Sequence, residues 1–225
     1  MRRFRDVETL AAKRHGGAAE LERLLKVTKP SSAEVIARVP GDRILALMTK
    51  RVFYSGFSRE IVDRKWADFE EAFFEFDPAA CAAIGGDVYD NLLANKSIVR
   101  NGAKIASVAK NAQFILDLKT EHGSAAGFFA DWPDERYVEL VLLIRKRGSR
   151  LGGDTGMRFL RDLGKPAFVL TGDVVKALIR EGVVSEPPTS RSQLMTVQDA
   201  MNRWSRESGR NLTDMSRILA MSVDG

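Results

Sequence analysis

Apolar residues recur along most of the chain at the three- and four-residue spacing of amphipathic helices. Glycine, proline, serine and asparagine stand between these stretches, where they end one helix and cap the next. The pattern predicts helices over 2–27 with a break at Gly16 and Gly17, from Asp42 through Met48, after Ser58, and over 104–120. The apolar run from Val138 to Ile144 could form a buried strand or a buried helix, and its neighbours favour a helix.

The remaining segments complete an all-α fold class, a bundle of many short helices. Short helices are expected over 79–84 and 174–179, a last helix capped at residues 196–199, and an amphipathic tail over 212–223. Residues 123–133 are expected to form a loop, and residues 186–190 an exposed linker. An aromatic group at helical spacing is expected in the core: Trp66, Phe69, Phe73, Phe74 and Phe76.

Cysteine and histidine are too few for a metal site. Cys81 is the only cysteine, and the chain has 2 histidines, so neither an internal disulfide nor a tetrahedral Cys/His zinc site is expected. Cys81 stands among small apolar residues and is expected to be a buried thiol. No metal and no cofactor is predicted.

The net charge of +5 favours a polyanionic partner, although only weakly. No apolar run reaches the roughly 20 residues that span a bilayer, and no signal peptide follows the basic start. A cytoplasmic protein without a membrane partner is therefore expected.

Basic residues cluster around one glycine-rich turn, in residues 145–160. Glycine lets the backbone approach a ligand closely, and the helix that follows presents free N–H groups to an anion. A DNA phosphate fits such a site without any base being read. The same sequence features would also be found in an ordinary turn between helices whose basic residues face the solvent.

Several motifs within residues 42–182 follow one another in a specific order. They are Tyr54-Ser55-Gly56-Phe57-Ser58, residues 66–78, Ile98-Val99-Arg100-Asn101-Gly102-Ala103-Lys104-Ile105 with Asn111-Ala112 after it, and Arg145-Lys146-Arg147-Gly148 leading to Gly152-Gly153-Asp154-Thr155. This order resembles the DNA-3-methyladenine glycosylase I family, within the helix-hairpin-helix glycosylase superfamily.

The resemblance implies a helix-hairpin-helix core that excises a damaged, alkylated base from double-stranded DNA. It places the base pocket at Arg51, Phe53, Tyr54 and Arg59. The expected contacts to the DNA backbone are Arg150, Gly152, Gly153, Thr155, Gly156, Arg158, Arg100 and Lys104. The superfamily's catalytic aspartate corresponds best to Thr171, and Asp173 stands two residues later.

Three departures from the family pattern leave a second function open. The family's zinc ligands are absent, its base-recognising glutamate corresponds to Arg51, and its stacking tryptophan corresponds to Arg59. Because arginine stays protonated, it would repel a cationic base. The alternative is therefore a catalytically inactive module that binds DNA.

The sequence also suggests three consecutive regions and a monomer. We expect an N-terminal helical extension over 1–41, a glycosylase-like core over 42–184, and a linker with C-terminal helices over 185–225 that pack on the core.

Overall fold

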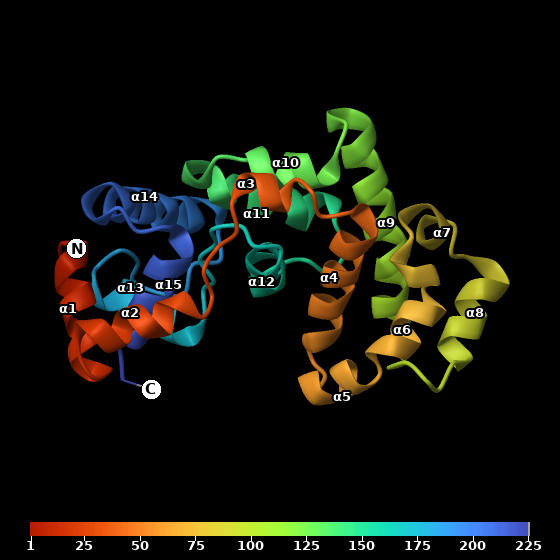
Figure 1. Ribbon diagram of the computed structural model, residues 1–225, viewed down its shortest axis with the longest axis horizontal. Coiled ribbons are helices and arrows are strands. Elements are labelled where there is room, and N and C mark those ends of the chain that lie inside the picture. Colours follow the sequence, from red (N-terminus) through yellow and green to blue (C-terminus); the bar gives the residue numbers. More distant parts are fainter. Residues whose placement is uncertain (225) are drawn as a thin grey trace. The chain divides into compact units, whose positions relative to one another are not determined.

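The structure is a computed structural model that describes residues 1–224, and it contains no strand among them (Figure 1). This confirms the all-α fold class. The chain divides into two compact units, each built from separate segments. The first comprises residues 1–31, 133–140 and 164–225, and the second comprises residues 32–132 and 141–163. The three consecutive regions expected from the sequence stay a prediction.

The second unit contains the helices of the candidate site. Its elements are α3 (Ala33–Ile36), α4 (Gly41–Tyr54), α5 (Arg59–Arg64), α6 (Trp66–Ala72), η1 (Phe74–Phe76), α7 (Pro78–Ala82), α8 (Gly86–Ala94), α9 (Gly102–His122), α10 (Ala125–Asp131) and α12 (Asp154–Asp162). Helix α11 (Tyr137–Arg147) begins in the first unit and ends in the second. The run 138–144 is therefore helical, as expected. Helix α4 packs against both α9 and α12.

Aromatic rings fill the core of the second unit beside α4. Phe69, Phe73 and Phe76 are fully buried and stack in sequence, and Phe53 meets Phe69 edge-on with 4.7 Å between ring centroids. Phe74 departs from the expected core, since it is 46% exposed. Residues 74–76 have φ values of 54°, 53° and 59°, and this left-handed turn directs Phe74 outward.

The first unit brings the two ends of the chain together. Its elements are α1 (Phe4–Arg14), α2 (Ala18–Lys26), η2 (Asp134–Arg136), α13 (Gly172–Arg180), α14 (Arg191–Ser208) and α15 (Leu212–Met221). Phe4 packs on Trp204 with 5.6 Å between ring centroids. Gly16 and Gly17 have φ values of 82° and 103°, which explains the predicted break between α1 and α2.

Two local expectations were wrong because nearby caps decide the helix starts. Residues 123–133 contain α10, since the Ser124 hydroxyl accepts a hydrogen bond from the Gly127 N–H and begins a helix there. Helix α14 starts at Arg191, where Ser190 and Gln193 form a capping box. Thr196, the expected cap, lies inside this helix.

Candidate functional site

The turn between α11 and α12, residues 148–153, is held by side chains and backbone of α9. Asn111 accepts a 2.7 Å hydrogen bond from the Ser149 N–H and donates a 3.1 Å bond to the Ser149 carbonyl. Arg150 adopts a positive φ of 59°, and its Nε donates to the Ala103 carbonyl at 3.2 Å. Leu151 is buried beneath the turn. The turn therefore has a defined conformation fixed to the core.

The glycines of this turn have different structural roles. A Cβ at Gly156 would lie 2.5 Å from the Leu151 carbonyl oxygen, and one at Gly148 would lie 2.8 Å from the Ile144 carbonyl oxygen. These two glycines permit close backbone packing. Gly153 has a φ of 58° with open space around it, and Gly152 has no atom nearer than 3.7 Å to such a Cβ. Gly152 and Gly153 therefore stand where a ligand can approach the backbone.

The N-terminus of α12 presents unpaired amides. Its N-cap residue, Gly153, has no side chain to satisfy them, and the amides of residues 153–156 donate to no other group in the described part of the chain. The dipole of this nine-residue helix adds partial positive charge at the same end. The exposed Arg150 adds a full charge next to the turn.

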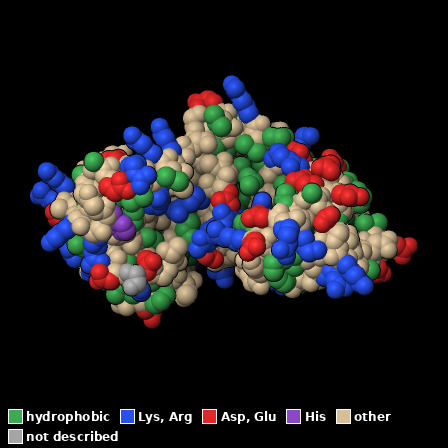
Figure 2. Space-filling model, turned by 60° about the horizontal axis from the view of Figure 1, so that its bottom comes forward, with side chains coloured by type: hydrophobic (Ala, Val, Ile, Leu, Met, Phe, Trp, Pro, Cys, Tyr) green, Lys and Arg blue, Asp and Glu red, His purple; other side chains and the backbone are tan. Residues whose placement is uncertain are grey.

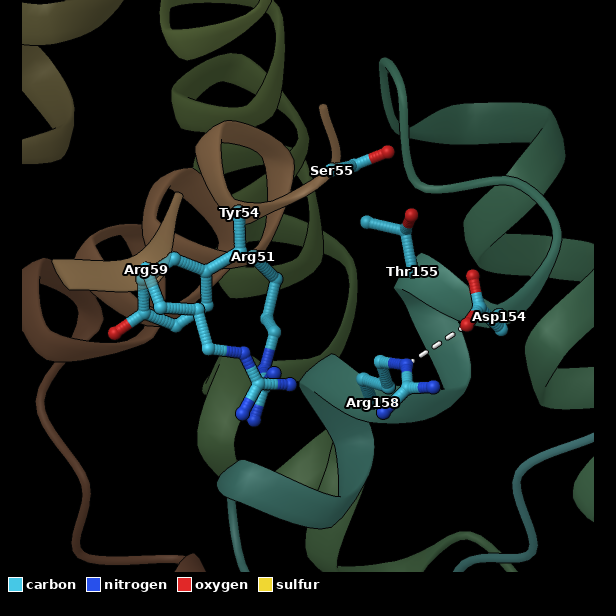
Figure 3. Close-up of a pocket in the computed structure, with 7 residues that line it drawn as sticks. All are labelled: Arg51, Tyr54, Ser55, Arg59, Asp154, Thr155 and Arg158. Atoms are coloured by element: carbon cyan, nitrogen blue, oxygen red, sulfur yellow. Dashed lines mark hydrogen bonds and ion pairs between the residues drawn. The ribbon is translucent and has the colours of Figure 1, made fainter. Parts of the chain in front are cut away.

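A cavity of about 290 Å³ lies beside this helix end (Figure 3). Arg51, Tyr54 and Ser55 line it from the end of α4, and Arg59 from the start of α5. Asp154, Thr155 and Arg158 of α12 line the opposite side. Of the four expected base-pocket residues, three thus meet here. The fourth, Phe53, is a correction: its side chain is fully buried in the aromatic core and does not line the cavity.

Guanidinium groups dominate the cavity. Arg51 forms a two-pronged ion pair with Asp162, while its Nη1 is buried without a partner. Arg158 Nε pairs with Asp154 at 2.8 Å. Arg59 has no hydrogen bond or ion pair within residues 1–224, and its Cζ lies 5.4 Å from the Tyr54 ring centroid. The cavity is therefore a site for electron-rich groups.

Tyr54 offers the aromatic surface of the cavity. Its hydroxyl donates to Asp63, which also pairs with Lys50 Nζ at 2.9 Å. Burial, together with the hydrogen bond to Asp63, raises the pKa of Tyr54 to about 12. The phenol is therefore neutral at physiological pH, and its ring lies against the guanidinium groups of Arg51 and Arg59.

Lys104 is a second correction, because it is not a surface contact for DNA. Its side chain is buried, and Nζ donates to the carbonyls of Val52 and Ser55 at the end of α4. Burial, and secondarily Arg150, lowers the pKa of Lys104. Lys104 thus secures the α4 end that carries Tyr54. Arg100, just before α9, is exposed as expected.

Thr171 and Asp173 belong to the first unit. The hydroxyls of Thr213 and Ser216 accept hydrogen bonds from the Ala167 and Val169 amides and so fix the segment before Thr171. Thr171 is the N-cap of α13, where its Oγ1 accepts a 3.3 Å bond from the Val174 N–H. Asp173 is half-buried and pairs with Lys176 at 3.3 Å.

The residues do not fit a zinc site. Cys81 is buried in α7, and no three Cys, His, Asp or Glu side chains converge anywhere in residues 1–224. Within the same range, no helix is long and apolar enough to cross a bilayer. Figure 2 shows basic side chains interspersed with acidic ones over the visible face. The charge total alone therefore does not locate the DNA-binding surface.

Sequence reasoning missed Ser55 and Asp154, which line the cavity, and Asp162, which pairs with Arg51. Asp154, Arg158 and Asp162 recur every four residues, so they share one face of α12. That spacing was the available signal.

A helical hairpin with a glycine-rich turn thus lies beside a cavity of about 290 Å³. The sequence model of one family, described as methyladenine glycosylase, matches residues 40–173. The chain belongs to this family, and its class is that of base-excision repair glycosylases. No curated relative matches at a significant level.

Two solved structures show the same fold. One is a single-residue variant of 3-methyladenine DNA glycosylase I in complex with 3-methyladenine, which is 22% identical with a TM-score of 0.50. That match covers 56% of this chain and 77% of the other. The second is the 8-oxoguanine DNA glycosylase of Thermotoga maritima, which is 16% identical with a TM-score of 0.53 and 95% coverage of both chains.

Proposed function

We propose that the protein flips a damaged base out of duplex DNA into the cavity between α4, α5 and α12 and hydrolyses its bond to deoxyribose. The observation that carries this proposal is the cavity itself. It joins an aromatic surface, Tyr54, to the amide-rich end of α12. One wall suits a base and the adjacent turn suits the phosphates that flank it. The protein is expected to act as a monomer in the cytoplasm.

The hairpin turn is proposed to hold the DNA backbone. The unpaired amides at 153–156 and the accessible backbone of Gly152 and Gly153 are suited to one phosphate. Arg150 and Arg100 are exposed and would contact neighbouring phosphates. Thr155 is largely buried, so its contribution would come through its backbone N–H. Arg158 lines the cavity and is reassigned to the base side.

The test is base release from synthetic duplexes with one damaged base each. The set should include alkylated, deaminated and oxidised bases, because the family name and the fold neighbours point to different damage. Released base and abasic sites would be measured separately. Failure to form abasic sites on any of these duplexes would contradict the proposal.

A second candidate function is DNA binding without chemistry. It is favoured by the arginines that enter the cavity and by the helix-capping role of Thr171, where the superfamily has a carboxylate. Tight, salt-sensitive binding to duplex DNA without release of any base would support it.

A further inference from the structure

The cavity carries more positive than negative charge, and part of it is unpaired. Asp162 and Asp154 each neutralise one arginine, Arg51 and Arg158. Arg59 forms no ion pair within residues 1–224, and the nearby carboxylate of Asp63 is shared with Lys50 and the Tyr54 hydroxyl. Arg51 also keeps a buried, unpartnered Nη1. A bound ligand therefore meets hydrogen-bond donors and a net positive field.

We propose that this cavity selects an uncharged base bearing an oxo group and rejects a cationic alkylated base. The inference rests on the proposed function, since it names the substrate class of the same cavity. A guanidinium within a few ångströms repels a cationic ring. An oxo oxygen, in contrast, accepts hydrogen bonds from guanidinium groups in the way that arginine recognises guanine.

The packing around Arg51 makes its guanidinium group a fixed donor. Asp162 holds two nitrogens of Arg51, and the Arg51 side chain is only 15% exposed. The Cζ atoms of Arg51 and Arg59 each lie 5.4 Å from the Tyr54 ring centroid. Both guanidinium groups point into the space between α4 and α12 (Figure 3). A base that enters the cavity would thus meet both of these cations, which lie over the Tyr54 ring.

The same donors would assist the bond cleavage. When the C1′–N bond breaks, its electron pair goes to the departing base, and an oxo group spreads that negative charge onto oxygen. Arginine donors stabilise this charge as it develops. A water oxygen then bonds to C1′, and the proton it loses ends on the base nitrogen. The products are a neutral free base and an abasic sugar. A cationic base leaves as a neutral molecule and gains nothing from these donors.

Three duplexes that differ only in the damaged base distinguish the effect of the base's charge from recognition of its oxo group. Hypoxanthine is a neutral 6-oxopurine, 7-methylguanine carries the same oxo group with a positive charge, and 3-methyladenine is cationic without it. A fourth duplex carries a tetrahydrofuran abasic analogue and reports backbone binding alone. Single-turnover release would be measured with spontaneous loss subtracted.

The variant is Arg59→Gln, and the matched control is Arg64→Gln. Both arginines are exposed on α5, but Arg64 does not line the cavity. We expect hypoxanthine to be released faster than either cationic base. Arg59→Gln should slow that release about ten- to a hundredfold, the loss of one charged hydrogen bond. Arg64→Gln should leave release unchanged, and neither variant should weaken binding to the abasic-analogue duplex.

Faster release of the cationic bases would overturn the inference and leave the glycosylase function standing. An Arg59→Gln variant that loses affinity for the abasic-analogue duplex as strongly as it loses release would identify Arg59 as a phosphate ligand, which also overturns it. If no duplex releases a base, the proposed function fails. The affinities of the duplexes then test the selectivity. Tighter binding of the hypoxanthine duplex than of the 7-methylguanine duplex would support the inference, and the reverse order would overturn it.

Discussion

Arg51, in the last turn of α4, forms a two-pronged ion pair with Asp162, the last residue of α12. The two side chains are 15% and 26% exposed. This pair joins the aromatic wall of the cavity to the second helix of the hairpin. The two halves of the candidate site, one for a base and one for the DNA backbone, therefore share a structural link.

Removing the carboxylate should destabilise the fold more than removing a surface ion pair. Asp162→Asn leaves Arg51 partly buried without its counter-charge, and we expect a loss of about 1–3 kcal/mol in the free energy of unfolding. Asp154→Asn breaks the more exposed pair with Arg158 and should cost less than about 1 kcal/mol. Urea denaturation of both variants measures the difference. Equal losses would mean that the Arg51–Asp162 pair has no special structural role.

Much of this fold follows from local sequence. Helix breaks at Gly16 and Gly17, caps such as Asn101, and the order of motifs lead to an all-α hairpin protein without tertiary information. The positions of Lys104 and Phe53 do not follow from it. A lysine in an amphipathic helix is typical of a solvated face, and only the packing of α9 on α4 shows that Nζ binds two carbonyls.

The cavity depends on contacts between residues far apart in sequence. Asp162 stands 111 positions after Arg51, so local pattern could not pair them. Thr196 shows that a local signal can also mislead. Its sequence predicts a helix cap, but Ser190 and Gln193 form a capping box that starts the helix six residues earlier.

Because Gly156 is closely packed, it is the position of the hairpin at which we expect a larger side chain to have the greatest effect. Gly156→Ala would place a Cβ 2.5 Å from the Leu151 carbonyl oxygen, which forces the turn to move. We expect DNA affinity to fall at least about tenfold, with a loss of about 1–3 kcal/mol in stability. Gly85→Ala, outside the turn at the start of α8, is the matched control, because no atom lies within 4 Å of the added Cβ. Fluorescence anisotropy with duplex DNA compares them, and equal affinities would remove the turn from the DNA interface.

Arg150 should contribute one phosphate contact to the DNA affinity. Arg150→Gln is expected to lower the slope of log affinity against log salt by about 1, the effect of one lost phosphate contact. Arg5→Gln, on the exposed side of α1, removes the same charge elsewhere and should leave the slope unchanged. Titrations at several salt concentrations test this. An unchanged slope in Arg150→Gln would place the phosphate contact on other residues.

Cys81 should be chemically inert in the folded protein. It is fully buried, its Sγ donates to the Phe73 carbonyl at 3.0 Å, and burial raises its pKa to about 12. At pH 8 only about one thiol in ten thousand is ionised, against roughly a quarter in the unfolded chain. The protonated thiol favours the folded state below the unfolded pKa, and that contribution disappears as the pH rises through about 12.

Iodoacetamide labelling followed by mass spectrometry compares the native and urea-unfolded protein. We expect labelling only after unfolding. Rapid modification of the native protein at pH 8 would show that the α7 region opens readily.

Variants at Thr171 and Asp173 test whether a carboxylate takes part in base release. The Asp173 side chain is 46% exposed and paired with Lys176, so Asp173→Asn should change stability by less than about 0.5 kcal/mol. We expect its base release to stay within about twofold of the wild type, because the arginine-lined cavity supplies the charge stabilisation.

Thr171→Ala removes the N-cap of α13 and should cost about 1 kcal/mol, again with base release retained in the folded fraction. Single-turnover release and thermal unfolding on the same samples separate the two effects. A hundredfold loss of release in Asp173→Asn with unchanged stability would make Asp173 catalytic.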